Sequence, residues 1–175
     1  MKTSRLLMFG LLAAAPALAS EPTQYLDLRT PAASLTARVT KDGLSSPDLQ
    51  LGLADTALRG RAFGRPVNIA LGDDHIGGIY LGGPVDLKLK EDGDILEARG
   101  SFGGQLTNFK VSPKSLTGTV GRCSYQLTSA KEQDRYQGTR SCGFGLENPV
   151  TLSIPPAIAD DDETLAATLS IVLAQ

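Results

Sequence analysis

Apolar and polar residues alternate along most of this chain, in short runs that turn residues separate. In Leu35–Val39, Leu49–Leu53 and Val85–Leu89, every second residue is apolar. This period of two is typical of strands with one buried face. Comparable runs occupy 56–63, 67–71, 75–81, 95–99, 106–111, 116–120, 124–128, 135–141 and 150–154. The spacing predicts an all-β fold, a single antiparallel β-sandwich or barrel of roughly ten or more short strands.

A glycine-rich pattern occurs twice, near residues 58–87 and 116–152, with a partial third copy at 99–108. Both full copies keep the order Leu, Gly, Gly-Arg, Leu, Gly and Pro-Val-x-Leu. Arg65 and Arg122 follow a glycine at matching places, which favours a structural role at equivalent bends. Glycines within strands mark bulges or tight bends. We therefore expect strand bends at the matching glycines Gly60, Gly64, Gly100, Gly104, Gly118 and Gly121.

The C-terminal segment differs from the rest, because Pro155-Pro156 interrupts the strand pattern and an acidic run follows. As a helix, this segment would be capped by Asp160 or Asp161. As a strand, it would place Leu169, Ile171 and Leu173 on one face. The alternation from Thr168 onward favours a closing strand, and the helix stays open as the alternative.

The first residues have the pattern of a secretory signal peptide. Lys2 and Arg5 precede an apolar run, and Ala17-Leu-Ala19 provides a small-residue cleavage site. The run is shorter than the roughly 20 apolar residues that a spanning helix needs. We predict a signal peptide at 1–19, an extended lead-in at 20–33 with a possible strand at 25–28, and a β domain at 34–175. We expect no transmembrane segment in the mature chain.

The charge of the mature chain bears on its partners. The signal holds two of the 17 basic residues and none of the 19 acidic ones, which leaves 15 against 19 and a net charge of −4. The remaining basic residues are scattered. A weakly acidic surface without basic runs argues against binding to nucleic acid and to anionic membrane surfaces.

Two cysteines in an exported chain predict one disulfide, Cys123–Cys142. A polar stretch between them is typical of a long hairpin with its tip near Glu132, so the cysteines would face each other at its base. Their Cα atoms should lie roughly 4.4–6.8 Å apart. Closing a loop of this size contributes about 3 kcal/mol to stability.

The sequence contains few groups that indicate catalysis. The single histidine, His75, lies beside Gly72-Asp-Asp74 in a turn context, and a Gly-x-Ser-x-Gly motif is absent. Clustered oxygen ligands make Asp160, Asp161, Asp162 and Glu163 a calcium candidate, although their spacing is not that of an EF-hand and favours a helix cap or solvated turn. We predict no catalytic residues, no other metal site and no cofactor.

These patterns predict a non-enzymatic, exported bacterial envelope protein in the periplasm or at the cell surface. It would act as a subunit or binding module of a complex in adhesion, motility or outer-membrane assembly, with other envelope proteins as partners. One alternative is a lipocalin-like barrel that binds a small ligand. The other is a carboxylate- or metal-dependent hydrolase, for which the acidic turns would supply the groups.

Overall fold

The computed structural model describes residues 23–54, 56–130, 135–143 and 145–174. The predicted signal peptide and the hairpin tip near Glu132 lie outside the described residues. The strands are β1 (Gln24–Arg29), β2 (Ser34–Thr40), β3 (Gly43–Ser45), β4 (Leu49–Ala54), β5 (Ala57–Ala62), β6 (Arg65–Gly72), β7 (His75–Tyr80), β8 (Gly83–Asp92), β9 (Ile95–Phe102), β10 (Gln105–Ser112), β11 (Ser115–Val120), β12 (Cys123–Ser129), β13 (Arg135–Cys142) and β14 (Asn148–Ser153). Two helices follow, α1 (Pro156–Ala159) and α2 (Asp162–Leu173).

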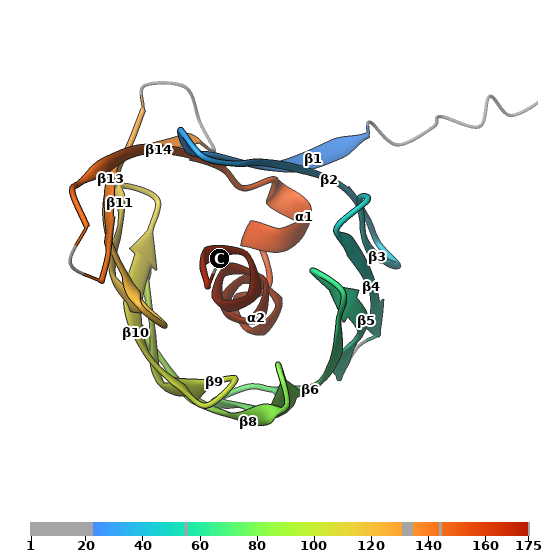
Figure 1. Cartoon of the computed structure of the whole chain (residues 1–175). Helices are drawn as coiled ribbons and strands as arrows, with labels where there is room; N and C mark the ends of the chain where they lie inside the picture. Colours follow the sequence, from blue (N-terminus) through green and yellow to red (C-terminus); the bar gives the residue numbers. More distant parts are fainter. Residues whose placement is uncertain (1–22, 55, 131–134, 144, 175) are drawn as a thin grey trace, which may run out of the picture.

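The strands form a closed antiparallel barrel (Figure 1). Each strand pairs with its neighbours in the sequence, and β1 closes the barrel by pairing with β14, with Asp27 opposite Ser153. This confirms the all-β prediction. The possible strand at 25–28 is β1, so the barrel begins at Gln24.

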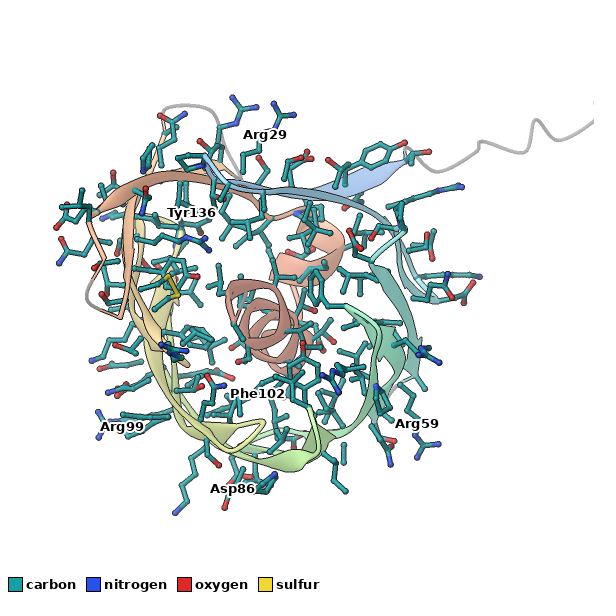
Figure 2. The ribbon with its side chains drawn as sticks, in the orientation of Figure 1. Arg29, Arg59, Asp86, Arg99, Phe102 and Tyr136 are labelled. Atoms are coloured by element: carbon teal, nitrogen blue, oxygen red, sulfur yellow. A yellow bond between two sulfur atoms is a disulfide. The ribbon has the colours of Figure 1, made fainter. Side chains whose placement is uncertain are left out.

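The alternation in the sequence separates the inside of the barrel from the outside. In β8, Val85, Leu87 and Leu89 are buried, whereas Asp86 and Lys88 between them are exposed. Figure 2 shows the same division for other strands, with the labelled Arg29, Arg59 and Arg99 pointing away from the wall and the rings of Phe102 and Tyr136 pointing inward. The wall therefore has an apolar inner face and a polar outer face.

The helix α2 lies along the barrel axis, inside the ring of strands (Figure 1). Every residue from Thr164 to Leu173 is buried. The prediction of a closing strand is therefore wrong, and the helical alternative holds. An isolated apolar face would reveal a helix by its period, but a helix buried on all sides is apolar or small all round and gives no such signal. Neither helix in the described part of the chain is long and apolar enough to cross a bilayer.

Inward-facing glycines allow the wall to curve tightly around α2. Gly100 has φ +150°, and a Cβ atom there would overlap the carbonyl oxygen of Asp86 on β8. Gly60 and Gly118 have the same conformation and the same close approach to a neighbouring strand, as predicted. The other three predicted bends are instead turn residues. Gly64, Gly104 and Gly121 lie in hairpin turns with φ of 75°, 76° and 60°.

The predicted disulfide is present between Cys123 and Cys142, which are directly opposite each other on β12 and β13. Their Cα atoms are 4.0 Å apart, slightly less than the predicted range. Directly opposed residues of an antiparallel pair approach most closely where they exchange no backbone hydrogen bonds. The bond ties two strands together at one end of the barrel.

Replacing Gly100 with Ala should destabilise the fold by at least about 2 kcal/mol, because the new methyl group meets the Asp86 carbonyl in a strained backbone conformation. Gly52→Ala is the matched control. Its Cβ would lie 3.7 Å from the nearest atom, the carbonyl oxygen of Arg59, at ordinary contact distance. Urea unfolding measures both variants, and equal effects would contradict this account of the curvature.

Replacing Cys123 and Cys142 together with Ser should lower the free energy of unfolding by about 3 kcal/mol, because the open chain gains conformational entropy. Urea unfolding of the oxidised chain and of the double variant measures the difference. Reducing the wild-type chain should reproduce the loss. An unchanged midpoint in both comparisons would show that the bond does not restrain the unfolded chain.

Candidate functional site

Some of the charges on the barrel wall, on β7 to β10, form pairs. His75 Nε2 lies 3.0 Å from Asp86 Oδ1, joining β7 to β8 on the outer surface. Glu97 accepts from Arg99 at 2.6 Å and lies 3.3 Å from the ammonium group of Lys110. Partial burial opposes ionisation of Glu97, but Lys110 and Arg99 outweigh it and lower the pKa of this carboxyl group. These pairs compensate charges locally, on β7 to β10.

His75 therefore has a local structural partner. Within the described part of the chain, its side-chain hydrogen bond is to Asp86, and no serine hydroxyl lies within hydrogen-bond distance of the ring. The half-exposed imidazole lies at the start of β7, next to the turn in which the sequence placed it. A Ser-His-Asp arrangement is not assembled among the described residues.

One end of the barrel carries most of the unpaired acidic groups, and we call it the acidic end. It consists of the turns after β2, β6, β8 and β10, the start of β13 and the first turn of α2. Its acids are Asp42, Asp73, Asp74, Glu91, Asp92, Asp94, Asp161, Asp162 and Glu163, and its basic residues include Lys41, Lys114 and Arg135. The described residues show no ion pair between these acids and a cation.

The helix start explains part of the acidic run. The Asp161 carboxylate accepts a 2.8 Å hydrogen bond from the backbone N–H of Thr164, which makes it the N-cap of α2. Asp162 and Glu163 follow in the first turn, where the positive end of the helix dipole favours acids. This is the capping role that the sequence favoured. No group of three or more potential metal ligands occurs among the described residues, so the calcium candidate is not assembled there.

The acidic groups at this end repel one another. Partial burial, together with the neighbouring Glu91 and Asp161, raises the pKa of Asp162. Partial burial and the charges of Asp161 and Asp73 raise the pKa of Glu163. The first turn of α2 therefore lies against the β6–β7 and β8–β9 turns, with several like charges close together.

A cavity of about 260 Å³ opens beside this turn. Its polar lining includes Asp94 and Asp162, and its apolar lining includes Ile95, Val111 and Leu165. Tyr136 borders it and donates a 2.9 Å hydrogen bond to the backbone oxygen of Ser112. The cavity combines an apolar floor with an acidic margin.

The opposite end of the barrel has a basic rim, and we call it the arginine end. It consists of the turns after β1, β3, β5, β7, β9 and β11 and the residues just before β14. It carries Arg29, Arg61, Arg65 and Arg122, with Asp48 and Glu147 as nearby acids. Arg65 and Arg122 both lie at hairpin turns of this end, which explains their matching places in the repeat. Arg61 donates a 3.0 Å hydrogen bond to the backbone oxygen of Gly64 and holds its turn.

The helix finishes beneath this rim. The hydroxyl of Tyr125 donates a hydrogen bond to the backbone oxygen of Leu173, one of the free carbonyls at the end of α2. Burial raises the pKa of Tyr125, and the neighbouring Arg140 partly offsets that rise. Burial likewise raises the pKa of Tyr80 to about 12, so both phenols stay protonated and act as fixed parts of this end.

The arginine end also exposes apolar side chains that the sequence analysis did not single out. Ile79, Leu81 and Leu106 are 55%, 42% and 68% exposed. One feature of the sequence could have indicated these exposed residues. The apolar residues Ile79, Tyr80 and Leu81 are consecutive and so interrupt the alternation directly before the turn glycine Gly82. These residues and the arginines face outward at one end. A lipocalin-like protein would hold its ligand along the barrel axis, but here α2 occupies that space.

The chain matches no known family model, no curated protein and no solved structure.

Replacing Glu91 with Gln should raise the melting temperature at pH 7 by about 1–3 °C, because it removes a like charge beside Asp162. A raised pKa in the folded state means that ionisation of Asp162 disfavours folding, so this stability deficit develops as pH rises from acid to neutral. The gain should therefore shrink toward acid pH, where Asp162 is protonated and carries no charge for Glu91 to repel. Circular dichroism melting curves measure it.

Asp92→Asn is the control for this prediction, because it removes the same charge from the neighbouring exposed residue. A gain for Asp92→Asn as large as that for Glu91→Gln would mean that general repulsion at this end, and not the contact with Asp162, governs the effect.

Proposed function

We propose that this chain is an exported, non-enzymatic envelope protein that acts as a subunit or binding module of a periplasmic or cell-surface complex. The observation that carries the proposal is the difference in charge between the two ends of the barrel. The described acids of the acidic end and Arg65 and Arg122 of the arginine end have no ion-pair partner among the described residues. Unpaired charge beside exposed apolar side chains is typical of binding surfaces.

The architecture supports a binding role for the outside of the molecule. The interior is occupied by α2 and by the apolar inner face of the wall, so the side chains available to partners lie on the outer wall and at the ends. The closed ladder leaves no free strand edge, and the described hairpin turns are held at fixed positions around each rim. Such a scaffold presents its turns rigidly.

The disulfide supports export. It joins strands in a chain whose described part has no free cysteine, and such bonds persist in oxidising compartments. The signal-peptide pattern at 1–19 points to the same route. Adhesion, surface motility and outer-membrane assembly are the settings in which an exported module of this kind would act.

Photo-crosslinking in the native host tests the proposal. A photoreactive residue at Leu81, on the arginine end, should give crosslinks to identified envelope proteins, including this chain itself. The same photoreactive residue placed instead of Thr117, on the outer wall, should give few crosslinks, because the wall is not the proposed contact surface. The readout is mass spectrometry of crosslinked bands from the envelope fraction.

Two results would contradict the proposal. One is that the protein fractionates with the cytoplasm and its cysteines are reduced. The other is a hydrolase activity of the purified chain against peptidoglycan, peptide or ester substrates that is lost in His75→Ala.

A further inference from the structure

An apolar strip runs along the rim of the arginine end. Ile79 lies opposite Pro84 in the β7–β8 hairpin, and Leu81 forms its tip. The neighbouring β9–β10 turn, Gly103-Gly104, has no side chain to interrupt the surface, and its backbone packs against the β7–β8 turn. Leu106 follows on β10. The strip therefore crosses four consecutive strands without a charged side chain at the rim itself.

Leu81 has an unusual conformation for its residue type. Its φ is 55°, and Gly82 follows with φ 77°. These values are typical of a two-residue hairpin turn, in which Asn or Gly usually takes the first place. A bulky residue there is strained, and it is nevertheless exposed to solvent. Strain retained at an exposed position is an indication of a functional role.

Arginines flank the strip on both sides. Arg65 follows the β5–β6 turn, and Arg122 lies in the β11–β12 turn, where the backbone N–H of Gly121 donates to the carbonyl oxygen of Leu106 at 2.9 Å. Both guanidinium groups are without an ion-pair partner among the described residues. The rim thus combines an apolar centre with free positive charge at its edges.

The acidic end of the same molecule has the complementary properties. Its cavity has a buried apolar lining that includes Val111 and Leu165, Ile95 lies exposed at its margin, and carboxylates such as Asp94 and Asp162 border it. At about 260 Å³, the cavity is smaller than the roughly 300–1,000 Å³ of typical small-molecule sites. It suits a protruding aliphatic side chain, with the acids placed to meet arginines around it.

We propose that the partner of the arginine end is the acidic end of a second copy of this chain. The tip of the β7–β8 hairpin, with Leu81, enters the cavity of the next barrel, and Arg65 and Arg122 face its carboxylates. This inference rests on the proposed function, because it names the partner of a subunit. It joins two different surfaces, so each copy keeps one free end and association continues as a head-to-tail row.

The direction of α2 is consistent with this arrangement. The helix starts at the acidic end and finishes at the arginine end, so the carbonyl terminus of one helix would face the amide terminus of the next. Helix dipoles in that order attract each other. The contact is small and partly ionic, so we expect weak association that salt screens.

Sedimentation velocity of the mature chain tests the proposal from about 10 μM to about 1 mM, a range suited to small interfaces. The weight-average sedimentation coefficient should rise with concentration at low ionic strength, and the rise should be much reduced at about 1 M salt, where the Debye length is about 3 Å. Leu81→Asp should raise the dissociation constant at least about tenfold. Asp tolerates positive φ better than Leu does, so this variant should fold.

The acidic end is tested by Ile95→Arg, which places a bulky cation at the margin of the cavity, beside its carboxylates. Thr117→Asp and Gln126→Arg make the same charge changes on the outer wall and should associate like the wild type. Melting curves verify that all four variants are folded.

Mixing the two end variants gives the decisive result. Leu81→Asp keeps a working acidic end and Ile95→Arg keeps a working arginine end, so each should be monomeric alone and the mixture should form a one-to-one complex that grows no further. A wild-type chain that stays monomeric throughout, or a mixture that forms no complex, would overturn the proposal. Binding of a monomeric wild-type chain to phosphatidylglycerol vesicles, lost in Leu81→Asp, would overturn it in favour of a lipid surface.

These results are separable from the proposed function. If the chain does not self-associate but position 81 crosslinks to other envelope proteins, the second copy is not the partner. The proposed function as a binding module then still holds. Cytoplasmic fractionation would remove the proposed function, whatever the purified chain does.

Discussion

The structure depends on the burial of α2 inside the barrel. Side chains from the wall can fill the interior of a barrel of about eight strands, whereas barrels of about sixteen leave an open channel. The fourteen strands here lie between these cases, so the wall alone would leave space along the axis. The helix fills that space, and its residues from Thr164 to Leu173 are buried. The apolar inner face of the wall and the apolar helix each need the other in order to be removed from water.

This requirement places limits on the wall. The strands must bend around a central cylinder while keeping their hydrogen bonds, and the inward glycines allow neighbouring backbones to approach more closely than a Cβ atom permits. Gly100 against the Asp86 carbonyl is one instance, and the repeat places equivalent glycines on β5 and β11. The glycine repeat is thus a consequence of wrapping a sheet around a helix. Tyr125 completes the fit by binding the Leu173 carbonyl at the helix end.

Most strands could be predicted from the sequence because alternation reflects a local property, the division of each strand between core and solvent. The strand β3 was not predicted, because its three residues are too few to show alternation. The segment that forms α2 was predicted as a strand, because a helix that is buried on all sides shows no helical period of apolar residues. The disulfide could be predicted, since its hairpin is local. The candidate site could not, because it depends on which turns gather at one end of a closed barrel.

That gathering follows from the connectivity. In an up-and-down barrel, successive turns lie alternately at the two ends, so a difference between alternate turns along the sequence becomes a difference between the two ends of the molecule. The turns Asp73-Asp74 and Asp92-Gly93-Asp94 follow even-numbered strands, whereas Leu81-Gly82 and Gly121-Arg122 follow odd-numbered ones. A small net charge therefore conceals a large separation of charge along the barrel axis. Once the strand count and the up-and-down order are known, the sequence itself shows that this molecule has two unlike ends, one rich in acidic and the other in basic residues.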